Sequence, residues 1–180
     1  YSLLEAVRQS GDSLKSVVIA STDKAYGSYD SDKMPYKEDY PLIPMYPYDV
    51  SKSASDLISQ SYSITYGLSV GILRCANLYG PGDNFHPTKS HVLPSLIRRF
   101  YEAKENSLKE VICWGSGLPR RDFLHVRDLG DACVFLLEKW DPFAESAPKD
   151  KNGIPLTMLN IGSGYDVSIK ELAKLIKEKY

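Results

Sequence analysis

Tyr48 and Lys52 stand four residues apart in the stretch PYDVSKSASDL, at the predicted start of a helix. Side chains at positions i and i+4 of a helix lie on one face, so we expect the two groups to point toward one place. A neighbouring ammonium favours the phenolate and lowers a tyrosine pKa that is otherwise about 10. Such a tyrosine can exchange a proton with a sugar alcohol, so the pair predicts an acid-base site.

The spacing alone also fits an ordinary helical pair. Tyr29 and Lys33 show the same spacing in the polar loop SYDSDKMP, where it has no chemical meaning. The context of the first pair is more informative, because the apolar run SVVIAS predicts a buried strand that ends in a polar turn, Thr22, Asp23 and Lys24. In open α/β sheets ligands bind beyond the carboxyl ends of strands, so this turn and the pair predict one site.

Helical and strand patterns alternate along the chain. The first part predicts a helix over residues 1–11, a strand over 16–21, a loop over 22–46, a helix over 47–66, a strand over 68–74 and a loop over 75–90. The second part predicts a helix over 91–106, strands over 109–114 and 122–126, a helix over 127–140, a connection over 141–155, a strand over 157–162 and a last helix capped by Ser168. This order is typical of βαβ units in an α/β fold.

Composition narrows the class of protein. The chain has 180 residues, of which 43% are hydrophobic and 25% charged, and a net charge of -1. Basic and acidic residues are interspersed, which predicts neither a nucleic-acid nor a membrane partner. The sequence shows no leader and no apolar run near the ~20 residues of a membrane span, so a cytoplasmic location is predicted.

The three cysteines are Cys75, Cys113 and Cys133. They are odd in number, far apart and set in apolar patterns, which predicts reduced core residues and neither a disulfide nor a metal site. Both ends of the chain fall inside predicted helices, so we expect a fragment of something longer.

The motifs resemble the extended short-chain dehydrogenase/reductases, the NAD-dependent epimerases and dehydratases of nucleotide sugars. The resemblance rests on the strand that ends in STDK, on the Tyr48/Lys52 pair and on the strand that ends near Asn77. It implies the C-terminal part of a Rossmann-type, doubly wound parallel sheet with a small substrate-binding lobe. Residues 1–80 would belong to the NAD(P)-binding domain and 81–180 mainly to the lobe, with some segments returning to the core.

The two halves resemble different members. The segments NLYGPGDNFHPTKSHVLPSLIRRF, WGSGLPRRDFLHVRDLGDACVFLL and LNIGSGYDVSIKELAKLI are similar to GDP-L-fucose synthase, which epimerises GDP-4-keto-6-deoxymannose at carbons 3 and 5 and reduces carbon 4 with NADPH. That family carries Ser-Ser-Cys where this chain has Thr22-Asp23-Lys24, a triplet that resembles nucleotide-sugar 4,6-dehydratases instead. The alternatives are therefore a dehydratase and a non-catalytic, nucleotide-sugar-binding paralogue.

The resemblance also implies catalytic roles. Tyr48 would handle the proton at the 4-oxygen, Thr22 would hydrogen-bond that oxygen, and Lys52 would hold the cofactor ribose. His91, in SHVLP, matches the family's catalytic histidine and titrates near neutrality. Lys24 or Asp23 would supply the second proton-transfer group of an epimerase, unless the two merely pair with each other.

Binding roles follow in the same way. The resemblance assigns the nucleotide diphosphate to Asn77, Arg99 and Arg121, whereas Trp114 would pack near the base or in the core. His125 is predicted to be structural, His86 is undecided, and Arg98 and Arg120 are predicted to be solvated.

The expected cofactor is NADP or NAD, held in part by Tyr48 and Lys52. Neither GSGLP nor NIGSG opens the first helix of a βαβ unit, so the glycine-rich pyrophosphate turn is expected before Tyr1 and the chain alone is expected to bind NADP(H) weakly. The other expected partners are a nucleotide-diphosphate sugar, with GDP favoured, and a second subunit in a homodimer.

Overall fold

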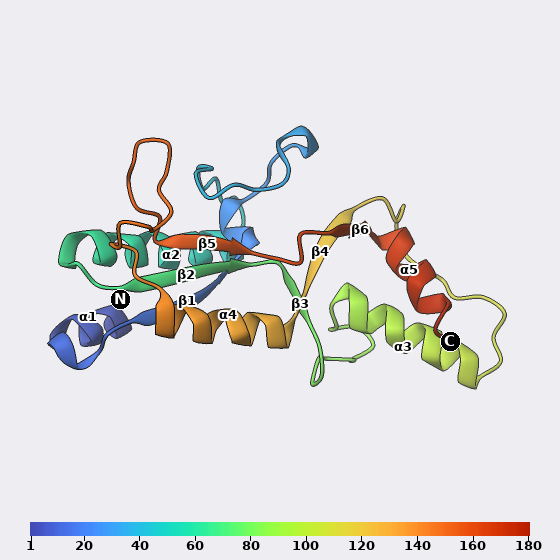
Figure 1. Cartoon of the computed structure of the whole chain (residues 1–180). Helices are drawn as coiled ribbons and strands as arrows, with labels where there is room; N and C mark the ends of the chain where they lie inside the picture. The colour runs from blue at the N-terminus through green and yellow to red at the C-terminus, as the bar shows by residue number, and fades with distance from the viewer. The chain divides into compact units, whose positions relative to one another are not determined.

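The computed structural model describes all 180 residues, which form two compact units (Figure 1). The first unit contains residues 1–76 and 128–161, and the second contains residues 77–127 and 162–180. No helix in the chain combines the length and the apolar character needed to cross a membrane.

A parallel sheet lies at the centre of the first unit. Its strands are β1 (Val17–Thr22), β2 (Val70–Cys75) and β5 (Met158–Ile161), in the order β1-β2-β5. Every residue of the central strand β2 is buried. This strand is covered on both faces, which explains why its sequence is almost continuously apolar. The predicted parallel α/β sheet is confirmed.

Helices on both faces of this sheet supply the cover. The helices are α1 (Ser2–Gln9), α2 (Pro47–Tyr66) and α4 (Val126–Lys139). Val70 and Ile72 pack in one cluster with Leu4 of α1 and Tyr62 of α2. The residue between them, Gly71, faces the opposite way, where a Cβ would stand 2.7 Å from a methyl carbon of Leu136 in α4. Because successive residues of a strand face opposite sides of the sheet, β2 packs against α2 on one face and against α4 on the other (Figure 1).

Local sequence defines the ends of α2, the helix with the candidate acid-base pair. Pro47 occupies its first turn, where a missing N–H has no cost, and Gly67 follows its last residue in the left-handed conformation, with φ of 66°. Both features were predicted, and the helix has the predicted bounds. The position of Tyr48 and Lys52 on its first two turns is therefore set by these end signals.

Helix α1 is attached to α2 by a polar contact as well as by Leu4. The Tyr62 hydroxyl donates to Glu5 Oε2 at 3.1 Å, and Arg8 Nε donates to Glu5 Oε1 at 3.0 Å. The Arg8 hydrogen bond holds the pKa of Glu5 at about 2, below its usual 4.5. Glu5 is thus a charged link between the two helices.

We expect this link to weaken in acid. Since the pKa of Glu5 is lowered by folding, its contribution to stability is present above pH 4.5 and is lost as the pH falls toward 2. Glu5→Gln should lower the melting temperature at pH 7 and make less difference near pH 2. Thermal unfolding of both forms at the two pH values measures this, and an equal difference at both would contradict it.

The second unit contains a small mixed sheet and two helices. Strand β4 (Arg120–His125) pairs in parallel with β3 (Asn77–Tyr79) and antiparallel with β6 (Asp166–Ser168). The helices are α3 (Val92–Glu105) and α5 (Ile169–Lys177), which share a core of Leu93, Leu96, Leu172 and Ile176. Ser168 caps α5 as predicted, with Glu171 completing a capping box.

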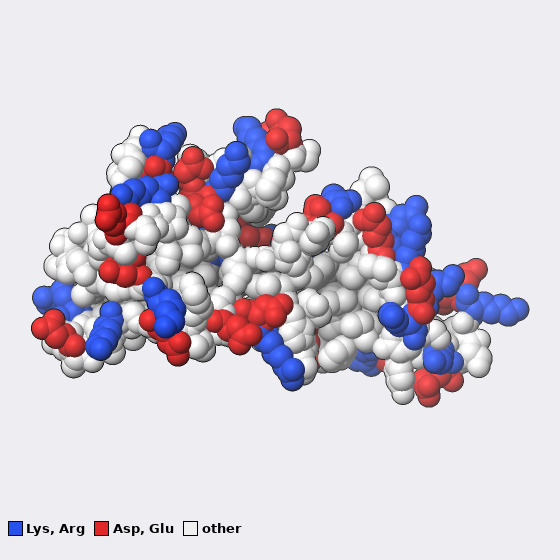
Figure 2. All heavy atoms as spheres, in the orientation of Figure 1, with Lys and Arg blue, Asp and Glu red and all other residues white.

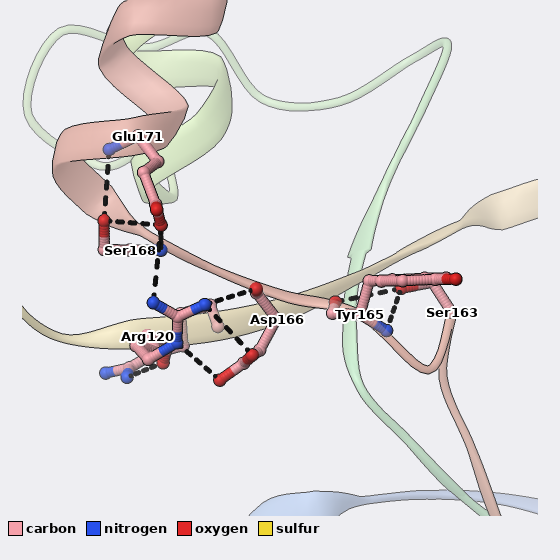
Figure 3. A network of polar contacts seen from close by, with 7 residues as sticks. Arg120, Ser163, Tyr165, Asp166, Ser168 and Glu171 are labelled. Carbon is pink, nitrogen blue, oxygen red and sulfur yellow. Dashed lines mark hydrogen bonds and ion pairs between the residues drawn. The ribbon is translucent and has the colours of Figure 1, made fainter.

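A polar network fixes the start of α5 to the sheet (Figure 3). Arg120 Nε on β4 donates to Asp166 Oδ2 on β6 at 2.9 Å, and Arg120 Nη1 lies 3.4 Å from Glu171 Oε2. The prediction that Arg120 is merely solvated is therefore wrong. Its side chain links β4 to β6 and α5, two consecutive elements whose contacting residues lie 46 and 51 residues later in the sequence.

Three other predictions about the second unit need correction. Residues 109–114 form no strand, and this run is not buried by any neighbour, because Ile112 and Trp114 are each 76% exposed. The short strand β3 lies where a loop was predicted, and β6 lies in a stretch to which no strand was assigned, since three residues show too little periodicity to detect. Cys113 is exposed rather than in the core, whereas Cys75 is buried and all three cysteines are free.

On the face drawn in Figure 2, acidic and basic side chains are interspersed, without a large area of one sign.

Candidate functional site

The turn after β1 carries three of the predicted catalytic residues. It is a short 3-10 helix, η2 (Asp23–Tyr26), capped by Thr22. Thr22 Oγ1 accepts from the Lys24 backbone N–H at 3.3 Å and donates to Asp23 Oδ1 at 3.1 Å. Lys24 Nζ lies 3.6 Å from Asp23 Oδ2. A substrate oxygen that accepts the Thr22 proton must therefore replace Asp23 as its acceptor.

Tyr48 and Lys52 lie together on α2, as the spacing predicted. The Lys52 ammonium stands 5.6 Å from the centre of the Tyr48 ring, within the range of a cation–π contact. The Tyr48 side chain is 55% exposed and that of Lys52 is half-buried. The phenol is thus open to a ligand, and a positive charge lies beside its ring.

A buried serine connects these two groups of residues. Helix α2 packs against η2 and β1. Ser53, directly after Lys52, is 3% exposed, and its Oγ lies 2.7 Å from the Ala25 carbonyl oxygen and 2.8 Å from that of Asp49. Its hydroxyl can therefore donate to the η2 backbone, which ties the helix with the acid-base pair to the turn with Thr22. Ser53 was not among the predicted site residues.

This tether leads to a prediction about stability. Ser53→Ala removes the donor and leaves the buried Ala25 carbonyl oxygen unpaired, so we expect the free energy of unfolding to fall by about 1–3 kcal/mol. Ser51→Ala is the matched control, because Ser51 is exposed and bonds only to the Tyr48 carbonyl of its own helix. Urea denaturation of both variants measures the difference, and equal losses would contradict the tether.

The remaining predicted site residues belong to the second unit. Asn77 Nδ2 donates to the Asp122 carbonyl oxygen at 3.0 Å, and Arg121 Nη1 donates to the Arg120 carbonyl oxygen at 2.7 Å. His91 is exposed at the N-cap of α3, where its side chain makes no capping bond. His91 and Arg121 lie on the surface, whereas Asn77 also holds β3 to β4.

Arg99 and Trp114 form a stacked pair. The Arg99 guanidinium carbon lies 4.0 Å from the Trp114 ring centre, and Nη1 donates to the Ile112 carbonyl oxygen at 3.0 Å. Trp114 is 76% exposed, so it is not a core residue. A cavity of about 280 Å³ lies beside it, and its other lining residues include Phe100 and three lysines, Lys170, Lys174 and Lys177. An aromatic wall with cations nearby can accept a planar, anionic ligand.

The other histidines have local partners. The His125 ring lies 5.3 Å from that of Tyr79, and its Nδ1 accepts from the Arg127 backbone N–H. His86 Nδ1 accepts from the Thr88 backbone N–H in an exposed loop. No group of His, Cys, Asp or Glu in the chain is arranged to hold a metal ion.

The fold and the first-unit site together define a class of protein. A parallel sheet with helices on both faces is the architecture of Rossmann-type α/β folds, and here the Tyr-Lys pair lies on a helix that is fixed to a strand-end turn. The NAD dependent epimerase/dehydratase family matches residues 1–148, and the chain belongs to this family. The predicted family is confirmed.

Individual relatives are consistent with this assignment. GDP-L-fucose synthase 1 of Arabidopsis thaliana is 49% identical over 131 residues, which cover 73% of this chain and 36% of that protein. GDP-L-fucose synthase of Escherichia coli K12 is 41% identical over 72% of this chain and 39% of its own length. A crystal structure of dTDP-glucose 4,6-dehydratase from Bacillus anthracis with NAD has a TM-score of 0.75 and 32% identity, covering 97% of this chain and 48% of that one. The chain thus spans little more than a third of the two synthases.

Tyr48 and Lys52 fit the ribose of the family's dinucleotide cofactor. The open Tyr48 phenol and the Lys52 ammonium offer hydrogen bonds that suit a ribose. The segments GSGLP and NIGSG do not form a pyrophosphate turn beside them, because GSGLP precedes β4 and Gly162 and Gly164 lie between β5 and β6 rather than between a strand and a helix.

Proposed function

We propose that this chain supplies the acid-base residues and part of the nucleotide site of a GDP-L-fucose-synthase-like enzyme, a GDP-4-keto-6-deoxymannose 3,5-epimerase/4-reductase. The observation that carries the proposal is the open Tyr48 phenol beside Lys52, on a helix that Ser53 ties to the Thr22 turn. Identity of 49% and 41% to two GDP-L-fucose synthases supports the choice within the family.

Each first-unit residue has a separate task in this proposal. Tyr48 gives a proton to the 4-oxygen of the sugar as a ketone is reduced, and Thr22 turns its hydroxyl from Asp23 to the same oxygen. Lys52 binds the ribose and stabilises negative charge on the phenol. The cofactor, NADP or NAD, supplies the hydride when it is bound.

Epimerisation also needs groups that move protons at carbons 3 and 5. We assign one role to His91, whose exposed imidazole has no capping bond, and the other to Lys24 or Asp23. Asn77 and Arg121, with Arg99, bind the nucleotide diphosphate in this assignment. The Asn77 amide and the Arg99 and Arg121 guanidinium groups keep donors free beyond the bonds described above.

The nucleotide role of Trp114 can be tested by binding. Trp114→Ala removes the surface on which Arg99 stacks, so we expect affinity for a GDP-sugar to fall about tenfold, or 1.4 kcal/mol. Tyr165→Ala is the control, because Tyr165 is an 82% exposed aromatic residue of the same unit that does not line the cavity. Calorimetry with the full-length protein compares them, and equal affinities would contradict the assignment.

A 4,6-dehydratase is the second candidate, favoured by the Asp23–Lys24 ion pair at the site and by the dehydratase neighbour. Asp23 would protonate the departing 6-hydroxyl while Lys24 assists removal of the proton at carbon 5. A non-catalytic, nucleotide-sugar-binding paralogue is the alternative that is not an enzyme.

One assay of the full-length protein separates these candidates. The proposal expects GDP-4-keto-6-deoxymannose to drive oxidation of NADPH with formation of GDP-fucose. If that substrate gives no oxidation, while a GDP- or dTDP-hexose with NAD gives a 4-keto-6-deoxy product, the protein is a dehydratase. Binding without either reaction identifies the paralogue.

The setting of the reaction is proposed in the same way. We assign it to the cytoplasm, in a homodimer whose interface includes the exposed apolar residues of α2, Val50, Leu57 and Ile64. The chain by itself would be inactive, because it carries no pyrophosphate turn. Light scattering of the full-length protein tests the dimer.

A further inference from the structure

A buried arginine lies between the two elements that carry the candidate catalytic groups. Arg74, on the central strand β2, is 2% exposed. Its Nε and Nη2 donate to Asp56 Oδ2 and Oδ1 at 2.7 and 2.9 Å. Two parallel bonds of this kind fix direction as well as distance, because both groups are planar.

Asp56 transmits this constraint to the acid-base pair. It lies four residues after Lys52 and eight after Tyr48, so the three side chains share one face of α2. Gln60 Nε2 donates to the same carboxylate at 2.5 Å, one further turn along. Arg74 therefore sets the rotation of α2 about its axis on the face that presents Tyr48 and Lys52.

The same guanidinium contacts the turn of Thr22 through Tyr26. Tyr26 is the last residue of η2 and is fully buried, and its ring centre lies 4.6 Å from the Arg74 guanidinium carbon. The Tyr26 hydroxyl donates to Asn160 Oδ1 at 2.7 Å, and its ring stacks on Tyr36 at 4.7 Å. The Arg74 guanidinium, which bonds to α2 through Asp56, thus also packs against the turn of Thr22 through the Tyr26 ring.

This arrangement is poorly explained by stability alone. Arg74 Nη1 is buried and has no hydrogen-bond partner, which carries a desolvation cost. Buried ion pairs are often no more stable than apolar residues of the same volume in their place. A role in orientation accounts for the charged residues better.

We propose that Arg74 is a positioning residue, which sets the Tyr48–Lys52 face of α2 against the Thr22 turn through Asp56 and Tyr26. This inference rests on the proposed function, since it assumes that these groups act on one substrate. Arg74 itself is buried and acts only through its neighbours.

The test separates positioning from stability. The double variant Asp56→Leu/Arg74→Met in the full-length protein replaces the ion pair by apolar side chains. We expect a melting temperature within a few degrees of the wild type, but a kcat about 100-fold lower, because displacements of about 1 Å have effects of this size. The KM for the nucleotide sugar should change little, because Arg99 and Trp114 belong to the other unit. A folded double variant with wild-type kcat would overturn the proposal.

Arg8→Met is the matched control. Arg8 also bonds to a carboxylate, that of Glu5, and its guanidinium carbon lies 5.4 Å from the Tyr66 ring centre, but both contacts are far along the helices from Tyr48. Its kcat should be that of the wild type. If the double variant does not fold, Arg74→Lys tests the positioning role instead, because lysine keeps the positive charge but cannot make the two parallel bonds to Asp56. The proposal then expects a kcat at least tenfold lower at unchanged KM, and an unchanged kcat refutes it.

Hydrogen exchange provides a readout that needs no activity. In the double variant, or in Arg74→Lys, amides of residues 23–26 and 48–53 should exchange faster, while those of α4 keep their protection. If the wild type turns over no nucleotide sugar, the proposed function fails, and this exchange pattern still tests the positioning role. Unchanged exchange in both segments would refute it.

Discussion

Tyr48→Phe should lower turnover of the nucleotide sugar by about three orders of magnitude, the scale of a lost general acid. The substitution removes one hydroxyl and leaves the ring beside the Lys52 ammonium. Because the nucleotide is assigned to other residues, the KM should stay within a few-fold of its wild-type value. Steady-state kinetics of the full-length protein measure both constants.

Tyr46→Phe is the control for this variant. Tyr46 is 63% exposed, lies just before α2 and makes no side-chain capping bond, so its hydroxyl has no assigned task. Its kcat should be that of the wild type. A Tyr48→Phe enzyme with near-normal kcat would remove Tyr48 from the chemistry, whatever the control shows.

Asp56→Ala should have the largest effect on stability. It leaves the Arg74 guanidinium buried without its carboxylate, and breaking a buried pair in this way costs about 3–5 kcal/mol. Asp131→Ala, at an exposed position of α4, should change the free energy of unfolding by less than about 0.5 kcal/mol. Urea denaturation measures both variants.

The ion pair adds a second arm to this experiment. Replacing Arg74 as well removes the uncompensated charge, so Asp56→Leu/Arg74→Met should regain most of the stability that Asp56→Ala loses. If the single and the double variants are equally unstable, the lost free energy of unfolding comes from packing around the side chains rather than from a buried Arg74 charge without a partner.

The sequence predicted the first unit better than the second, for a physical reason. Pro47 and Gly67 act locally on the ends of α2, and the apolar run of β2 reflects burial on both faces. The run at 109–114 is equally apolar, yet Ile112 and Trp114 are each 76% exposed. Whether such a run becomes a strand depends on the neighbours that pack against it and bury it, which a single segment does not encode.

Only part of the candidate site could be predicted from the sequence. The spacing of Tyr48 and Lys52 follows from helix geometry, so their contact was foreseen. Ser53 and Arg74 were not, because their partners lie 28 and 18 residues away. An arginine within an apolar strand is a usable signal for such a contact, since a charge is buried there only with a partner.

Asn160 bears on how the first unit is made on the ribosome. Its side chain accepts from Tyr26, 134 residues earlier, and donates to the Tyr36 carbonyl oxygen, while its backbone N–H donates to Glu38, 122 residues earlier. Helix α2 and its end signals emerge long before these bonds can form. At about 5–20 residues per second, residue 160 is synthesised roughly 6–24 seconds after Glu38, and during this time the 27–46 segment is exposed to proteases and chaperones without these bonds.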